Sequence, residues 1–164
     1  MSIYGILSTL HSVNRWLVLI FLIWAIISAV SARGTMNVAD NPGSSVLPKG
    51  ALPAFITTHI QLLLGLLLWG GALAGWSGVG SPYVRMDKTA WEEAGGEIMR
   101  FYSVDHFTYM LPAILIITIG YMVAKRTSTS AKSAFWIMVS YGIALALILF
   151  AIPWPWGKFN PGWW

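Results

Sequence analysis

The chain of 164 residues has no cysteine, and only 10% of its residues carry a formal charge. Without cysteine it can form no disulfide, no thiolate metal site, no iron–sulfur cluster and no covalent c-type haem attachment. Its ten basic residues are scattered along the chain, so the formal net charge of +4 forms no basic patch or stripe. This pattern does not indicate a nucleic-acid partner.

Apolar residues are abundant instead: they make up 57% of the chain and gather in four long runs that are almost free of charge. Runs of this length predict transmembrane helices in contact with a lipid bilayer. We expect spans at about residues 3–32, 51–76, 101–124 and 133–152, with a polar insert at about 77–99. Because the connections are short, the four spans predict one all-α domain, an integral membrane bundle in up-down-up-down order.

Basic residues are divided unevenly between the two ends of this predicted bundle. The end opposite the N-terminus receives five basic residues and one acid: Arg33, Lys49, Lys125, Arg126, Lys132 and Asp40. The N-terminal end receives four basic residues and four acids: Arg85, Lys88, Arg100, Lys158, Asp87, Glu92, Glu93 and Glu97. Lys and Arg near span ends favour the cytoplasmic side. We therefore expect both termini and the insert to be periplasmic.

Two of the three histidines are placed alike with respect to the apolar runs. His11 lies near the start of the first span and His106 near the start of the third, and a similar apolar length follows each. Ionisable groups at membrane depth are costly, so they mark candidate functional sites. The first and third spans are diagonal neighbours in a simple four-helix ring. A b-type haem between them would take His11 and His106 as its two axial iron ligands.

Polar residues accompany His11 on its own helical face. Asn14 and Arg15 follow it by three and four positions, which places all three side chains on one side of a helix. The planar guanidinium of Arg15 matches a carboxylate, so it would pair with a haem propionate. We include both residues in the candidate cofactor site.

The second histidine also has polar neighbours. Tyr109 shares the face of His106, and Asp105 directly precedes it. Asp105 would orient an imidazole or pair with Arg15. The sequence leaves two alternatives open for these groups: a purely structural network of Arg15, Asp105 and the histidines, or a site for a quinone or another pigment.

The third histidine, His59, enters the membrane from the opposite end. Since no other histidine lies near it, a second bis-histidine haem is not expected. His59 would form a hydrogen bond or a quinone contact, or serve only in a contact between helices. A chlorophyll-type pigment held by this single axial histidine is the remaining alternative.

The chain resembles a family of small four-span bacterial membrane proteins, common in the Bacteroidetes group, that are loosely labelled cytochrome-b-like. The residues that carry the resemblance are Leu10-His11-Ser12-Val13-Asn14-Arg15-Trp16, His59-Ile60-Gln61-Leu62 with Gly65, Asp105-His106 with Met110, and Ile152-Pro153-Trp154-Pro155. The resemblance covers nearly the whole chain and implies a haem protein of the bacterial inner membrane. The family has glutamate before the third-span histidine, so the contact of the shorter Asp105 is left open.

These features predict a small b-type cytochrome-like subunit of a larger respiratory or photosynthetic electron-transfer complex. It would move electrons between quinol and a periplasmic carrier. The chain has no substrate-binding domain, so a stand-alone enzyme is not indicated. The alternative, from a different class, is a non-catalytic accessory subunit that packs in a larger complex or a homo-oligomer and binds lipid, quinone or pigment.

Overall fold

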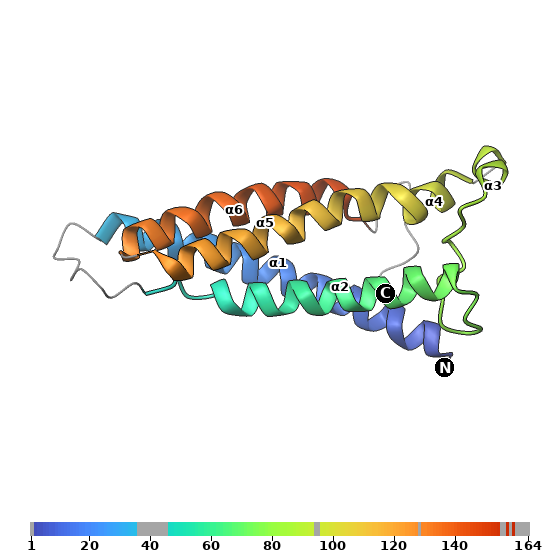
Figure 1. Cartoon of the computed structure of the whole chain (residues 1–164), viewed down its shortest axis with the longest axis horizontal. Coiled ribbons are helices and arrows are strands. Elements are labelled where there is room, and N and C mark those ends of the chain that lie inside the picture. Colours follow the sequence, from blue (N-terminus) through green and yellow to red (C-terminus); the bar gives the residue numbers. More distant parts are fainter. Residues whose placement is uncertain are drawn as a thin grey trace.

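The computed structural model contains four helices that are long and apolar enough to cross a membrane. It describes residues 2–35, 46–93, 96–127, 129–154, 157 and 159, without the side chains of 33–35 and 90. The long helices are α1 (Ile3–Thr35), α2 (Ala51–Leu73), α5 (His106–Arg126) and α6 (Ser130–Ala151). The insert carries the short α3 (Lys88–Glu92), and α4 (Gly96–Arg100) follows it (Figure 1). The described residues contain no strand.

The third span is longer than its apolar core because three elements form one continuous helix. A π-helical turn, η1 (Phe101–Asp105), joins α4 to α5, and the residues at both of its ends keep right-handed helical backbone angles. The backbone N–H of His106 donates to the carbonyl of Phe101, five residues earlier, which is the hydrogen bond that defines a π turn. The helix therefore begins at Gly96, five residues before the predicted start of the span.

The other helix ends lie within three residues of the predicted bounds, and local signals explain the differences. Behind α2, Gly75 adopts φ 67°, and the N–H groups of Gly75 and Trp76 return to the carbonyls of Ala72 and Gly71. This Schellman pattern stops the helix at Leu73. The hydroxyl of Thr129 accepts the N–H of Lys132 and so starts α6 at 130 rather than 133.

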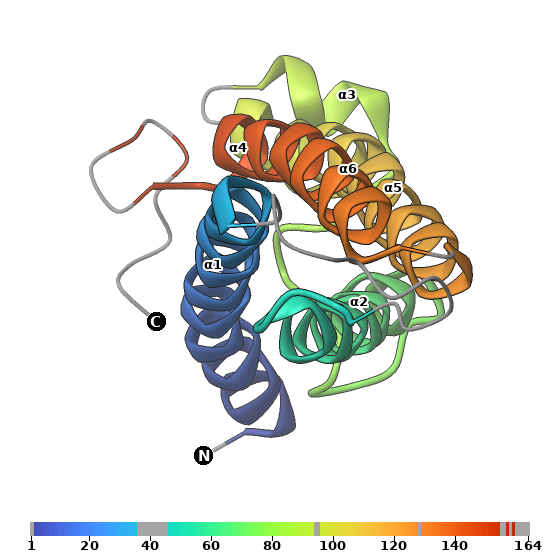
Figure 2. The ribbon, with the colours of Figure 1, turned by 90° about the vertical axis from the view of Figure 1, so that its left-hand side faces the viewer.

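Viewed along the bundle, α1 and α5 lie at opposite corners, with α2 and α6 at the other two (Figure 2). Helix α1 packs against both α2 and α6, and α5 packs most closely against α6. Small side chains permit this approach: Ala113, Ala134 and Ala144 are fully buried. The diagonal pair α1 and α5 is thus held apart, which leaves room for a cavity between them.

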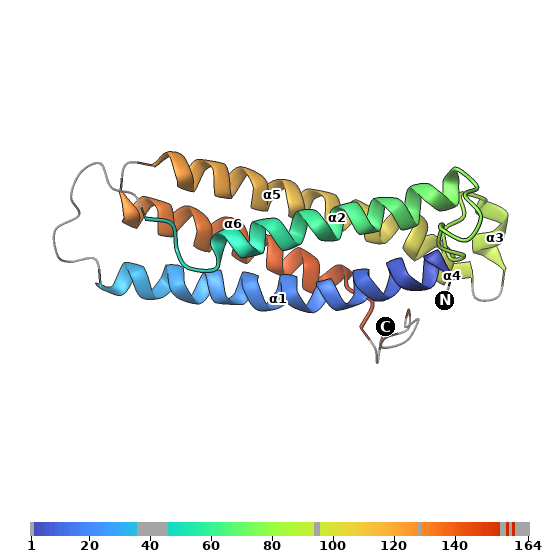
Figure 3. The ribbon, with the colours of Figure 1, turned by 90° about the horizontal axis from the view of Figure 1, so that it is seen from below.

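Contacts at the two ends of the bundle assign the loops to them. The N–H of Tyr4 donates to the carbonyl of Gly78, so the insert lies beside the N-terminal end of α1 (Figures 1 and 3). At the other end, the N–H of Val46 donates to the hydroxyl of Ser130. Of the residues used to predict orientation, Asp40, Lys158 and the side chain of Arg33 lie outside the described residues. The same is true of Ala94 and Gly95 in the predicted insert and of Pro155 in the final motif.

Candidate functional site

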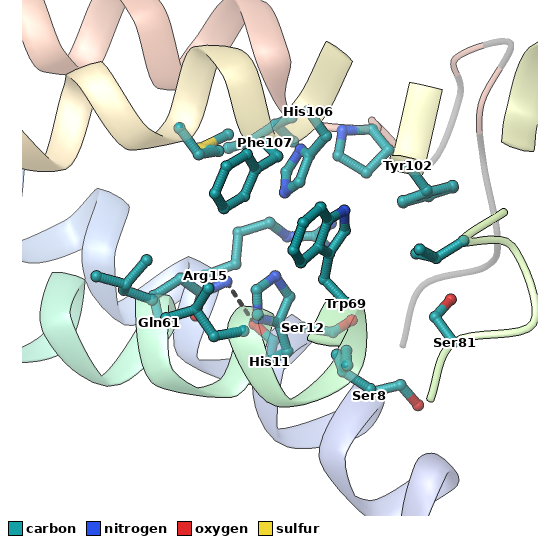
Figure 4. Close-up of a pocket in the computed structure, with 18 of the residues that line it drawn as sticks. Ser8, His11, Ser12, Arg15, Gln61, Trp69, Ser81, Tyr102, His106 and Phe107 are labelled. Carbon is teal, nitrogen blue, oxygen red and sulfur yellow. Dashed lines mark hydrogen bonds between the residues drawn. The ribbon is translucent and has the colours of Figure 1, made fainter. Parts of the chain in front are cut away.

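A cavity of about 370 Å³ lies at the insert end of the bundle, between the diagonal helices α1 and α5. Its walls are mainly apolar and also include α2, the end of α6 and the insert. The polar and aromatic side chains that matter for its chemistry are His11, Arg15, Gln61, Trp69, Tyr102 and His106 (Figure 4). A cavity of this size and composition is typical of sites for small molecules and cofactors.

The two histidines singled out in the sequence meet in this cavity. Their ring centroids are 6.4 Å apart, and the ring planes make an angle of 68°. His11 comes from α1 and His106 from the start of α5, so each imidazole reaches inward from one corner of the bundle. In Figure 4 a ring nitrogen of each histidine is directed into the space that the two rings share.

His106 is oriented by the end of α6. Its Nδ1 lies 3.0 Å from the carbonyl oxygen of Ala151. Because a carbonyl oxygen only accepts, Nδ1 carries the proton, and Nε2 keeps a free lone pair. Metal-bound histidines commonly have this arrangement, in which the second ring nitrogen donates to a carbonyl and fixes the tautomer.

The π-helical turn before His106 is tied to the rest of the bundle through Ser103. Its hydroxyl donates to the carbonyl of Arg85 and accepts the N–H of the same residue, both at 2.8 Å. The carbonyl of Ser103 accepts the indole N–H of Trp69 at 2.9 Å. The Trp69 ring stacks on Phe107 with centroids 4.9 Å apart and an angle of 8°, so the two rings form a flat aromatic wall of the cavity.

His11 is positioned by polar contacts between α1 and α2. The amide of Gln61 donates to the backbone carbonyl of His11 at 3.0 Å and accepts from the amide of Asn14 at 2.7 Å. The Asn14 amide also donates to the carbonyl of Thr57 at 2.9 Å. Asn14 is buried against α2 and does not line the cavity. It therefore supports His11 from behind, whereas the sequence placed it in contact with the cofactor.

Arg15 lines the cavity, and among the described residues its guanidinium has no ion-pair partner. Its Nε and Nη2 atoms are buried and have no hydrogen-bond partner in the described part of the chain, and the same is true of Nδ1 of His11. The expected pair with Asp105 does not form, because Asp105 Oδ2 lies 3.4 Å from Nε of Arg100 instead. Asp105 also does not orient His106, whose Nδ1 is taken by Ala151.

Two further candidate residues lie outside the cavity. Tyr109 is 39% exposed and contacts Phe150 edge to face on the outer side of α5 and α6. His59 joins α2 to α5: its Nδ1 donates to the Phe55 carbonyl at 2.7 Å, and its Nε2 lies 3.3 Å from the Thr118 hydroxyl. This placement matches the helix-contact interpretation of His59.

Other residues of the site were not selected from the sequence. Gln61 and Gly65 stand in the motif that contains His59, but the sequence alone does not mark them as site residues. Their spacing of four positions, on the face of α2 that also carries Trp69, was the available signal. The link between Ser103 and Arg85 had no signal, because it joins a helix to an irregular loop.

Comparison of the chain with protein-family models, with curated proteins and with solved structures gives no match. The function is therefore argued from the cavity and its residues.

Proposed function

We propose that the chain is a small b-type cytochrome of the bacterial inner membrane, with one haem between α1 and α5 and His11 and His106 as its axial ligands. The observation that carries the proposal is the separation of the two rings. Histidine nitrogens bind metal ions at about 2 Å, and a ring centroid lies about 1 Å behind its nitrogen, so two imidazoles on opposite sides of one metal have centroids roughly 6 Å apart. The centroids of His11 and His106 are 6.4 Å apart.

The residues around the pair fit a haem in three respects. Rings that share one nitrogen–iron–nitrogen axis can make any angle with each other, so 68° is compatible with ligation. The tautomer of His106 leaves Nε2 free to bind a metal. Nδ1 of His11 is buried without a hydrogen bond in the described part of the chain, a cost that a ligand bound to this atom would remove.

The donor set also favours a macrocycle over a bare metal ion. Among the described residues, no group of three or more His, Asp or Glu side chains is placed to hold a metal. A porphyrin supplies four nitrogen ligands itself and needs only two from the protein. The flat wall formed by Trp69 and Phe107 and the apolar lining would exclude water from such a ring.

In this proposal the four long helices cross the membrane in up-down-up-down order. Lys49, Lys125, Arg126 and Lys132 belong to the end away from the insert, which would face the cytoplasm. Helix α6 ends beside His106 at the insert end, and Phe159 stacks on Phe101 with centroids 4.5 Å apart, so the described chain after α6 stays at that end. Both termini, and the haem near that end, would then be on the periplasmic side.

A bound haem would supply one-electron transfer, while the described residues hold the ring, orient its ligands and exclude water. We infer that the chain serves as the haem-bearing subunit of a larger electron-transfer complex, as its resemblance to cytochrome-b-like proteins implies. A subunit that binds a quinone or pigment without iron ligation is the alternative.

The test is the reduced-minus-oxidised absorption spectrum of the detergent-purified protein, together with haem extraction. We expect a b-type α-band with about one haem per chain, and its loss in His11→Gly and in His106→Gly. His59→Gly is the matched control and should keep the band, because His59 lies outside the cavity. Added imidazole should restore ligation in the two cavity variants, which separates a lost ligand from a misfolded chain. A folded wild-type protein without the band would contradict the proposal.

A further inference from the structure

We infer that the ligand of the cavity carries a carboxylate, and that the guanidinium of Arg15 binds it. This inference rests on the proposed function in that it identifies which end of the proposed haem Arg15 recognises. It stands on the charge balance of the cavity rather than on the histidines, so the two can be tested separately.

The cavity has an unbalanced positive charge. Arg15 is the one described lining residue with a permanent formal charge, and none of the described lining residues is acidic. A guanidinium is always protonated, so this charge cannot be removed by loss of a proton. An uncompensated charge at membrane depth is energetically costly. An anionic ligand would remove this cost.

The acids near this end of the bundle are engaged or exposed elsewhere. Asp105 pairs with Arg100 at 3.4 Å. Asp87 accepts the N–H and the hydroxyl of Thr89 at the start of α3. The remaining described acids are exposed on or beside α3 and α4: Glu92, Glu93 and Glu97. No described acid of the protein therefore lies where it could neutralise Arg15.

The two unpaired nitrogens specify the shape of the missing partner. Nε and Nη2 form one edge of the guanidinium, which protein atoms cover in the ligand-free chain. When the side chain turns this edge toward a ligand, its two parallel N–H groups match the two oxygens of a carboxylate. The Cζ atom lies 5.3 Å from the ring centroid of Trp16, which gives Arg15 a cation–π contact but supplies neither Nε nor Nη2 with a hydrogen-bond acceptor. In Figure 4 the side chains of Arg15, His11 and His106 point into the same space, so a carboxylate on a ligand between the histidines would be within reach.

The experiment compares two metal-free probes that differ only in their carboxylates: protoporphyrin IX and its dimethyl ester. Their fluorescence is titrated with the detergent-purified wild-type protein and with variants. We expect the wild type to bind the acid roughly ten- to a hundredfold more tightly than the ester, the range for a charge-assisted hydrogen-bonded pair. Arg15→Gln should bind both probes with the affinity that the wild type has for the ester.

Two variants complete the comparison. Arg100→Gln removes an exposed arginine that pairs with Asp105 outside the cavity, and it should keep the full preference for the acid. Arg15→Lys keeps the positive charge but loses the two parallel N–H groups of the guanidinium, so it should keep only part of the preference for the acid over the ester. It also shows whether loss of preference in Arg15→Gln reflects binding rather than misfolding.

The outcomes separate this inference from the proposed function. Equal binding of acid and ester by the wild type, or no binding of either, overturns the role of Arg15. If haemin nevertheless gave the b-type spectrum, the haem proposal would stand without it. Conversely, preference for the acid together with no histidine-dependent spectrum would support a carboxylate ligand and remove the haem.

Discussion

Gly65 of α2 lies directly against the imidazole of His11: a Cβ atom at position 65 would be 3.2 Å from Cε1 and 3.7 Å from Nδ1 of that ring. Any larger residue would have to move the imidazole or the helix. The absence of a side chain at one position of α2 thus sets the rotation of a ring carried by α1.

Gly65→Ala should therefore turn the ring of His11 and perturb the ligand field of a bound haem. We expect a shifted α-band and midpoint potential, with weaker haem retention. Gly70→Ala is the matched control in the same helix, since a Cβ there has nothing within 4 Å. It should leave the spectrum unchanged and stabilise the helix by up to about 1 kcal/mol. Equal spectral effects of the two variants would contradict this role of Gly65.

The contact between Asn14 and Gln61 should contribute to stability as one unit. Asn14→Ala leaves the Gln61 carbonyl oxygen without its donor at 2.7 Å, and we expect a loss of roughly 1–2 kcal/mol in the free energy of unfolding. Gln61→Leu should cost a similar amount. The double variant should lose less than the sum, because each single change already breaks the shared contact. Thermal unfolding followed by circular dichroism measures all three, and strict additivity would refute the coupling.

A close contact between α5 and α6 predicts a strong steric effect. A Cβ at Gly120 of α5 would overlap the side chain of Ser140 on α6. Gly120→Ala should destabilise the protein by roughly 1–3 kcal/mol, the usual cost of overpacking. Gly142→Ala, with open space at its Cβ, should not. Adding Ser140→Gly to Gly120→Ala exchanges the small residue across the interface and should restore most of the unfolding midpoint; failure to restore it would place the clash elsewhere.

The orientation of the chain in the membrane can be read with single cysteines, because the sequence has none of its own. Lys88→Cys places a thiol on α3 at the insert end, and Lys132→Cys places one at the opposite end; both lysines are exposed. We expect a membrane-impermeant maleimide to label Lys88→Cys in spheroplasts, and Lys132→Cys only after the membrane is opened. The reverse pattern would place the proposed haem on the cytoplasmic side.

The sequence predicts the four apolar spans well because the thickness of a bilayer sets the number of consecutive apolar residues that a spanning helix needs. It also indicated that His11 and His106 belong together, since each is followed by a similar apolar length. Depth along a helix can thus be estimated from composition. This estimate needs no knowledge of how the helices are rotated.

Rotation about each helix axis could not be predicted in the same way. Helices that are apolar on every side have no amphipathic pattern to show which face is inside. The sequence therefore places Asp105 and Tyr109 in the site although neither lines the cavity, and it places Asn14 at the cofactor although Asn14 bonds to α2. The π-helical turn adds to the difficulty, because it changes the rotation within one span.

The π-helical turn at Phe101–Asp105 has a consequence for how sequences related to this chain should be aligned. Such a turn holds one residue more than an α-helical path needs, and each α-helical residue rotates the chain by about 100°. A relative without the extra residue could keep the imidazole of His106 in place only by turning Ser103 away from Arg85. A correct alignment would then require a single-residue gap within an apolar span, where gaps are normally penalised. That gap would distinguish chains in which the insert bonds to the third span as Arg85 does here from chains in which it does not.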